Sequence, residues 1–319
     1  MTYNSIADLG ADVIRLYTDK QYQQAYDLAI DESGNFPESE DTILYWQACM
    51  LAMLDNGKDA LELLEQSHAK GYWYPQRQLE DEPDFDAIKN NQRFVELVKT
   101  SRARMAEAQS QAKPTLAIYE PGGYQPGEGE SIPTLIALHS NNGNAEVTAA
   151  EWTPITESGW LVAVPQSSQV SSPRGYVWDD YDVGEQEVVE HFADIMQRYP
   201  QAKREVVLGG FSMGAGLAIW LAMGCADLSA RGFLVLGPYL PDVAALEPYL
   251  EAAQQRGMRG YIVVGEQDVQ CYEVAQQVHK LLNDSGIPCE LELRTDIQHN
   301  YPGDFADVLE RGLAFIQEA

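Results

Sequence analysis

The sequence predicts an α/β fold, a mostly parallel sheet with helices on both faces, preceded by a small all-helical domain. Two observations lead to this prediction. From residue 114 onward, short apolar runs alternate with segments of helical length, which is the pattern of a parallel sheet. Residues 1–110 instead show a 3.6-residue periodicity with little β-branched alternation, which indicates helices.

The candidate helices of the first domain cover residues 5–18, 20–31, 40–55, 57–69 and 83–110. An internal repeat supports them, because the spacing of Tyr22, Ala25 and Leu28 recurs from Gly57 onward. The offset of about 35 residues is close to the period of helix-turn-helix repeats. Two units bury too little apolar surface alone, so the last stretch is expected to close the domain. This part of the chain weakly resembles tetratricopeptide repeats.

Seven apolar runs are candidate strands: 115–119, 134–138, 160–164, 205–209, 232–237, 260–264 and 289–293. The helix-length segments cover residues 183–198, 212–224, 242–257, 270–285 and 304–318. The first two runs are joined by a Gly/Pro-rich turn without a helix, which predicts an antiparallel hairpin. The polar segment 110–114 separates the predicted helical domain, 1–112, from the predicted catalytic domain, 113–319.

The charge restricts the partners. The chain has 49 acidic and 21 basic side chains, a net charge of −28. Such a charge repels phosphate backbones and anionic headgroups, so neither nucleic acid nor a membrane surface is an expected partner. No apolar run approaches the roughly 18 residues that a membrane span needs. With no signal peptide and no CxxC among its four cysteines, we expect a cytoplasmic protein with reduced thiols.

The sharpest motif is Gly210-Phe211-Ser212-Met213-Gly214, between an apolar strand and an apolar helix. A serine at such a strand-to-helix turn needs small neighbours two residues away on each side, because the backbone is strained and the flanking elements come close. The turn exposes the hydroxyl, and the helix N-terminus favours a developing oxyanion. We predict that Ser212 is a nucleophile.

A serine nucleophile needs a base, which is usually histidine. Of the five histidines, His68 belongs to the helical domain, and His191 and His279 lie inside predicted helices. His139 precedes the nucleophile, at the end of an early strand. His299 follows the last strand and precedes the last helix, which places it at the carboxyl edge of the sheet. We therefore choose His299 as the base.

The acid that orients the base should come between the serine and the histidine in the chain. Asp268 lies just beyond a predicted strand and is the preferred candidate. Glu266, two residues closer to that strand, and Asp296, three residues before His299, are the alternatives.

The oxyanion of a tetrahedral intermediate needs backbone donors. One should be the N–H of Met213, the residue after the nucleophile. The second should come from the loop after the second strand, where His139 and Gly143 would hold the turn. There the N–H of Asn141, or that of Ser140, would point inward.

Residues 114–319 resemble the phospholipase/carboxylesterase branch of the α/β-hydrolases, which includes acyl-protein thioesterases. The segments LHSNNGN, GGFSMGAG, VVGEQD and QHNYPGDF carry the resemblance, in the order of that family. It implies a triad of Ser212, Asp268 and His299 that hydrolyses carboxylic esters or thioesters without a cofactor. One departure is Ser140, where the family usually has glycine. Its side chain would narrow the oxyanion loop or lend it a hydroxyl.

Three aromatic residues are candidates for lining an acyl or leaving-group pocket: Trp178, Tyr181 and Tyr301. Packing is an equally good explanation of all three. The nearby acidic residues Asp179, Asp180 and Asp182 precede a predicted helix, with no histidine or cysteine near them. Acidic side chains at that position interact with the helix dipole, so we expect no metal site.

Two classes of function therefore compete. The first is a hydrolase acting on a small ester or thioester, with a serine peptidase as a variant on the same fold. The second is a non-catalytic interaction protein, in which the helices bind a protein partner and the hydrolase fold is a relic. Relics tend to lose a member of the triad, and here every role has a candidate in the right order, which favours the enzyme.

Overall fold

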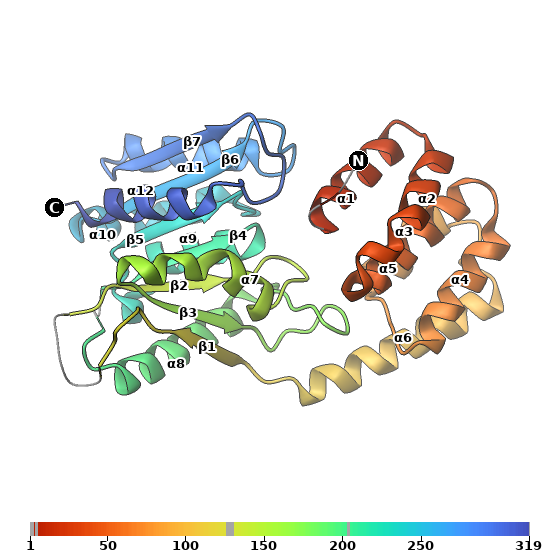
Figure 1. Cartoon of the computed structure of the whole chain (residues 1–319), viewed down its shortest axis with the longest axis horizontal. Coiled ribbons are helices and arrows are strands. Elements are labelled where there is room, and N and C mark those ends of the chain that lie inside the picture. The colour runs from red at the N-terminus through yellow and green to blue at the C-terminus, as the bar shows by residue number, and fades with distance from the viewer. Residues whose placement is uncertain (1–2, 4–5, 126–130, 203–204, 319) are drawn as a thin grey trace. The chain divides into compact units, whose positions relative to one another are not determined.

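The computed structural model (Figure 1) describes residue 3 and residues 6–125, 131–202 and 205–318. The chain divides into two compact units. The first comprises Met1–Ala112 together with Val170–Pro173, and the second comprises Lys113–Gln169 and Arg174–Ala319. The sequence did not predict that Val170–Pro173 would group with the helical residues.

The described part of the first unit contains the helices α1 (Ile6–Thr18), α2 (Tyr22–Asp31), α3 (Glu40–Met53), α4 (Gly57–Ala69), α5 (Gln76–Leu79) and α6 (Gln92–Gln111). One apolar cluster joins α1, α2 and α3, and a second joins α3, α4 and α6. Helices α2 and α4 begin at the first residue of each copy of the predicted repeat. Ala25 and Ala60, at corresponding positions, are both fully buried, since only a small side chain fits between such closely packed helices.

The second unit is built on one seven-stranded sheet: β1 (Thr115–Tyr119), β2 (Thr134–Leu138), β3 (Leu161–Gln166), β4 (Val207–Phe211), β5 (Gly232–Leu236), β6 (Arg259–Gly265) and β7 (Cys289–Arg294). The strand order is β1-β3-β2-β4-β5-β6-β7. All neighbouring pairs are parallel except β1 with β3. The predicted fold class is therefore confirmed.

The predicted hairpin of the first two strands is wrong. β1 pairs antiparallel with β3, from Thr115 opposite Gln166, and β2 lies between β3 and β4. Every residue of β2 is buried, so this strand needs a neighbour on both sides, whereas the ends of β1 are exposed and suit a sheet edge. Residues 126–130 of the connecting turn lie outside the described residues.

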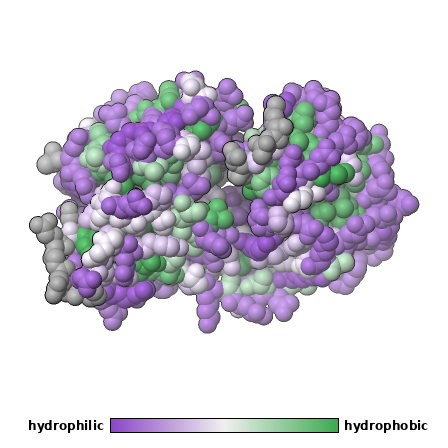
Figure 2. Space-filling view, in the orientation of Figure 1, coloured by the Kyte–Doolittle hydropathy of each residue, from purple (hydrophilic) through white to green (hydrophobic). Residues whose placement is uncertain are grey.

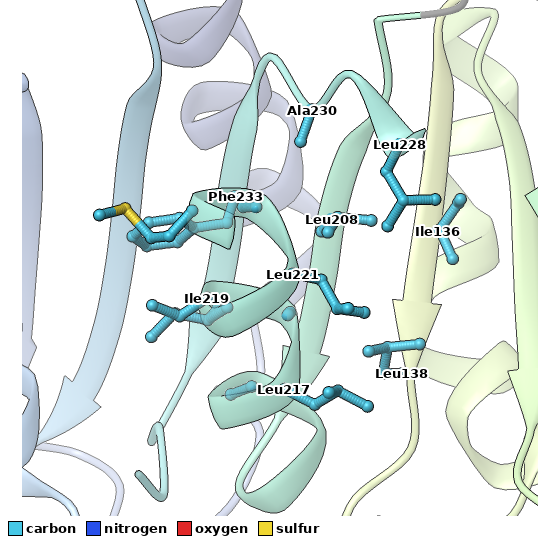
Figure 3. Packing of buried hydrophobic residues seen from close by; sticks show 14 of the residues in the cluster. Ile136, Leu138, Leu208, Leu217, Ile219, Leu221, Leu228, Ala230 and Phe233 are labelled. Atoms are coloured by element: carbon cyan, nitrogen blue, oxygen red, sulfur yellow. The ribbon is translucent and has the colours of Figure 1, made fainter. Parts of the chain in front are cut away.

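Helices cover both faces of the sheet (Figure 1): α7 (Ala145–Trp152), α8 (Tyr181–Arg198), α9 (Met213–Gly224), α10 (Leu250–Gln255), α11 (Tyr272–Asp284) and α12 (Phe305–Gln317). One apolar cluster holds α8, α9, α10 and α11 on one face, and a second holds α7 and α12 on the other. Figure 3 shows Leu217, Ile219 and Leu221 of α9 packed over Leu208 and Phe233 of the sheet. Because α9 is apolar on all sides, it is fixed in the centre of the unit.

Hydrophilic residues predominate on the face shown in Figure 2, in keeping with the net charge of −28. Among the helices that the structure describes, none combines the length and the apolar character that crossing a bilayer requires.

Candidate active site

Ser212 lies between the last residue of β4 and the first residue of α9. Its φ of 56° and ψ of −116° are rare for a residue with a side chain. A Cβ on Gly210 would approach the carbonyl carbon of Gly214 to 2.6 Å, and one on Gly214 would approach the carbonyl oxygen of His139 to 2.3 Å. Backbone contacts therefore leave no room for a side chain at either glycine, which is why the turn needs small residues on both sides of the serine.

Three side chains from three loops form a hydrogen-bonded chain. The Oγ of Ser212 lies 2.9 Å from Nε2 of His299. The Nδ1 of His299 lies 2.7 Å from Oδ2 of Asp268. Ser212 follows β4, Asp268 follows β6 and His299 follows β7, so all three lie at the carboxyl edge of the parallel strands.

Two backbone N–H groups fix the orientation of the Asp268 carboxylate. Its side chain is buried, and its Oδ1 accepts the backbone N–H groups of Gln270, at 3.2 Å, and Cys271, at 3.1 Å. Its other oxygen, Oδ2, is thereby directed at His299. A carboxylate held in this way can orient the imidazole and stabilise it when it is protonated.

The two alternative acids, Asp296 and Glu266, lie in exposed positions. The carboxylate of Asp296 is exposed and forms two hydrogen bonds, each 2.9 Å long, with the guanidinium of Arg294. Glu266 is exposed as well, and its backbone N–H donates to the carbonyl of Arg294. Of the three acids, Asp268 is the one whose carboxylate is hydrogen-bonded to His299.

His139 is fully buried and has a structural environment rather than a catalytic one. Its Nε2 accepts the N–H of Ser167 at 3.2 Å, so the neutral tautomer carries its hydrogen on Nδ1, which donates to the carbonyl of Ser140 at 2.9 Å. Burial lowers the pKa of His139 to about 4 and keeps the ring neutral. His139 thus holds the start of the predicted oxyanion loop.

The rest of that loop is a tight turn. The N–H of Gly143 donates to the carbonyl of Ser140 at 3.0 Å, and Asn142 between them has a φ of 56°. A Cβ on Gly143 would lie 2.9 Å from the Oγ of Ser140, so the serine occupies the space that glycine leaves. Asn141 is exposed at the tip. The N–H of Met213 belongs to the first residue of α9, where a helix has no internal acceptor for it.

The structure favours packing for two of the three candidate pocket aromatics. Trp178 is fully buried, stacks on His139 with ring centroids 4.6 Å apart, and donates its indole N–H to the carbonyl of His139 at 3.0 Å. The hydroxyl of Tyr301 accepts the indole N–H of Trp152 at 3.1 Å. Tyr181 differs, because its buried hydroxyl has no hydrogen-bond partner among the described residues.

One group of potential metal ligands coincides with the triad: Asp268, Cys271 and His299, with ligand atoms within 4.8 Å of one another. The acid and the histidine are already bonded to each other, and burial raises the pKa of the Cys271 thiol to about 12. A metal needs the thiolate, so these residues fit a proton relay better than a cation site. Asp180 caps α8 by accepting the N–H of Val183 at 3.2 Å, the role expected of that acidic run.

Sequence reasoning did not detect two sets of hydrogen bonds near the predicted oxyanion loop. The carboxylate of Glu187, on α8, is buried and accepts hydrogen bonds from the N–H and the hydroxyl of Ser168. The N–H of Tyr176 donates to the carbonyl of Gly143 at 2.8 Å. These contacts join residues far apart in the chain, and no local pattern marks them.

Three comparisons place this chain among known proteins. Residues 5–109 match a family described as the N-terminal domain of A/B hydrolase-like proteins. An uncharacterised protein from Bacillus cereus is 25% identical over 99% of both chains, with a TM-score of 0.57. The esterase PE8 is 16% identical over 64% of this chain and 99% of its own, with a TM-score of 0.54. No curated protein matches the sequence significantly.

The family model matches the helical residues, and the Bacillus cereus protein aligns with nearly the whole chain, so both parts of the chain have known relatives. The resemblance to α/β-hydrolases that the motifs predicted is confirmed. The chain therefore has the fold of the α/β-hydrolases, and its residues 5–109 are similar to the N-terminal domains of A/B hydrolase-like proteins.

Proposed function

We propose that this protein is a serine hydrolase of the phospholipase/carboxylesterase branch, which cleaves carboxylic esters or thioesters through an acyl-enzyme on Ser212. The observation that carries the proposal is the continuous hydrogen-bonded chain from Ser212 through His299 to Asp268, with contacts of 2.9 and 2.7 Å. Asp268 is buried, accepts two backbone N–H groups and is directed at the imidazole of His299, next to a serine with a strained backbone. A hydrolase fold that had lost its activity would not be expected to keep this arrangement.

In the first half of the reaction, the Oγ of Ser212 attacks the carbonyl carbon of the substrate. Its proton passes to Nε2 of His299, and the new charge on the imidazole is stabilised by Asp268. The carbonyl π electrons move to the substrate oxygen, which becomes an oxyanion. We assign its two donors to the N–H groups of Met213 and Asn141, from the start of α9 and from the oxyanion loop.

Collapse of this intermediate breaks the bond to the leaving group, which takes the proton from His299 and departs as an alcohol or a thiol. Water then adds to the acyl group on Ser212 by the same route in reverse, and the carboxylic acid leaves. Each residue ends in its starting state, so no cofactor is consumed. One neighbour with the same fold is named an esterase, which supports this reaction class.

The test is covalent labelling with a fluorophosphonate probe, followed by assays with p-nitrophenyl esters of graded length, acyl-CoA thioesters and small peptides. We expect one labelled site per chain, at Ser212, and hydrolysis of esters or thioesters. Ser212→Ala should lose labelling and turnover. Peptide cleavage as the main activity would favour the peptidase alternative, and absence of any Ser212-dependent labelling would leave the non-catalytic alternative.

A cytoplasmic location and a protein partner for the helical unit belong to this proposal as well. All four cysteines are free and buried, which suits a reducing compartment. Fractionation of cells and capture with the full chain would test these two points.

A further inference from the structure

The loop between β7 and α12, residues 295–304, carries His299, the base of the proposed reaction. Loops ordinarily vary more in position than the elements that they connect. This loop nevertheless holds the imidazole within hydrogen-bond distance of two other loops, 2.7 Å from Asp268 and 2.9 Å from Ser212. Contacts other than those of the triad must therefore fix its position.

Arg294, the last residue of β7, makes such contacts at both ends of the loop. Its guanidinium forms two hydrogen bonds of 2.9 Å each with Asp296. Two more, of 2.6 and 3.1 Å, join it to Asp304, the residue before α12. A third acid, Glu292, accepts from the same guanidinium at 3.0 Å. The guanidinium is thus bonded to acids of the strand, the loop and the start of the helix.

These ion pairs differ from ordinary surface pairs. Most exposed pairs contribute little, but paired hydrogen bonds from one guanidinium to one carboxylate fix direction as well as distance. The Arg294 side chain is only 16% exposed, and the backbone carbonyl of Arg294 accepts the N–H of Glu266 at 2.8 Å. The side chain therefore extends from a fixed point at the end of the sheet.

The carboxylate of Asp304 binds Arg294 instead of capping α12. Aspartate in the position before a helix ordinarily accepts a backbone N–H of the first turn. Asp304 occupies that position, but its side chain forms no such bond in the part of the chain that the structure describes, and both of its oxygens are bonded to Arg294. Asp296 is only two residues from Arg294 and restrains little of the chain. The contact that closes the loop is therefore the one with Asp304.

Inside the closed loop, the backbone before His299 lies against the end of β6. A Cβ on Gly265 would approach the carbonyl oxygens of Ile297 and Gln298 to 2.4 and 2.5 Å. The side chain of Ile297 is buried. The loop thus packs on the strand that leads to Asp268, and a movement of the loop changes the distance from His299 to Asp268.

We propose that Arg294 is a positioning residue for the hydrolysis, because its bonds to Asp304 close the loop that carries His299. Fixed by the closed loop, the imidazole stays between the carboxylate of Asp268 and the hydroxyl of Ser212. Catalytic groups have to be held within about 0.5 Å of their productive positions, so loosening the loop is costly to the rate. The inference rests on the proposed function, because it requires His299 to act as the base.

The first test compares Arg294→Met, Arg294→Lys and Arg259→Met in the full chain, on one p-nitrophenyl ester. Arg259 is a matched control, since its side chain is also 16% exposed but lies at the opposite end of the sheet, where β6 begins. We expect Arg294→Met to lower kcat by about 10- to 100-fold with little change in KM. Arg294→Lys should stay within about threefold of Arg294→Met, because an ammonium keeps the charge but cannot bind two carboxylates in pairs. Arg259→Met should match wild type.

A second pair of variants separates closure of the loop from the mere pairing of Arg294. Asp304→Asn and Asp296→Asn each remove one negative charge beside Arg294, and asparagine is accepted before a helix as readily as aspartate. We expect Asp304→Asn to lower kcat by about three- to tenfold and Asp296→Asn to leave it near wild type. In the folded variants with lowered kcat, the far-downfield proton resonance of the hydrogen bond between His299 and Asp268 should broaden or disappear, which a loss of stability alone would not cause.

Wild-type kcat in Arg294→Met, full recovery in Arg294→Lys, or equal kcat for Asp304→Asn and Asp296→Asn would overturn the positioning role while Ser212-dependent turnover persists. A sharp, unshifted proton resonance in a slow variant would overturn it too. If Arg294→Met does not fold, Asp304→Asn and its control decide the question alone. Absence of Ser212-dependent turnover in wild type would instead reject the proposed function.

Discussion

The backbone of Ser212 is held in a conformation that glycine tolerates and other residues do not. Strain of this kind costs roughly 1–3 kcal/mol and survives only where the surroundings enforce it. Here β4 and α9 enforce it from both sides. The half-buried hydroxyl thereby lies 2.9 Å from Nε2 of His299, instead of capping the helix that it precedes.

This strain predicts a difference between two inactive variants. Ser212→Gly should be more stable than Ser212→Ala, by about 1 kcal/mol, because only the alanine keeps a Cβ at a φ of 56°. Urea unfolding of both variants measures the difference, and neither should turn over substrate. An alanine variant that is as stable as the glycine variant would show that the turn is not strained.

The choice of acid gives a second prediction at this scale. Asp268→Asn should leave the protein folded and lower kcat by roughly 10⁴, because an amide at this position favours the wrong tautomer of His299. Asp296→Asn should have little effect on kcat, since its exposed carboxylate pairs with Arg294. Steady-state kinetics of the two variants decide the matter, and a larger loss for Asp296→Asn would make our assignment wrong.

Two buried histidines make stability depend on pH. Burial lowers the pKa of His139 and of His68 to about 4, whereas an unfolded histidine titrates near about 6.5. Their contribution to stability is complete above the unfolded pKa, and it is lost as the pH falls toward the folded pKa, because only the unfolded chain binds the protons. Each histidine should lower the free energy of unfolding by about 2 kcal/mol at pH 5 relative to pH 7.5.

Urea unfolding at the two pH values measures this loss. His68→Gln, which can keep a hydrogen bond to Ser101 at the position of the imidazole, should show a smaller loss than wild type. The same pH dependence in both proteins would argue that His68 is protonated in the folded state.

At the scale of elements, the close approach of α9 to the loop after β5 is the tightest contact of the site. A Cβ on Gly216 would lie 1.9 Å from the carbonyl oxygen of Tyr239. The N–H of Tyr239 in turn donates to the carbonyl of Ser212 at 3.0 Å, so this loop is bonded to the turn at Ser212. Displacing the loop therefore displaces Ser212.

We expect Gly216→Ala to lower the free energy of unfolding by about 1–3 kcal/mol, the cost of overpacking, and to reduce kcat as well. Gly122→Ala is the matched control, because a Cβ there meets nothing within 4 Å. Thermal unfolding and ester hydrolysis of the two variants provide the measurement. A stable and fully active Gly216→Ala would mean that α9 and the loop can separate without affecting the turn.

Elements also show why sequence could predict some features and not others. The turn around Ser212 was predictable because strand, glycines and helix are adjacent in the chain. His299 was found by elimination among five histidines, and its loop follows β7 directly. The pairing of β1 was not predictable from its neighbours, because its partner is β3, beyond the whole of β2 and α7. Long-range contacts such as that of Tyr176 with Gly143 have no local signature at all.

At the scale of the whole molecule, the second unit has its own cores on both faces of its sheet. A chain of residues 113–319 should therefore fold and hydrolyse a small activated ester. Circular dichroism and kinetics on esters of graded length test this.

The acyl-length profile of that truncated chain separates two uses of the helical unit. A changed preference would mean that the helices cover the substrate pocket, and an unchanged preference would support a protein partner. An insoluble product would mean that the two units share one core, and the boundary at residue 112 would then be wrong.

The antiparallel pairing of β1 with β3 also has a consequence in time. During synthesis β1 leaves the ribosome first of the seven strands, but it cannot pair until β3 has been made. Thr115 therefore stays unpaired until Gln166 emerges, which takes several seconds at roughly 5–20 residues per second. Folding of the first unit is delayed as well, because the unit is complete only when Val170–Pro173 has emerged. Nascent chains stopped before residue 166 therefore lack the partner strand of β1, and we expect them to remain exposed to chaperones and proteases.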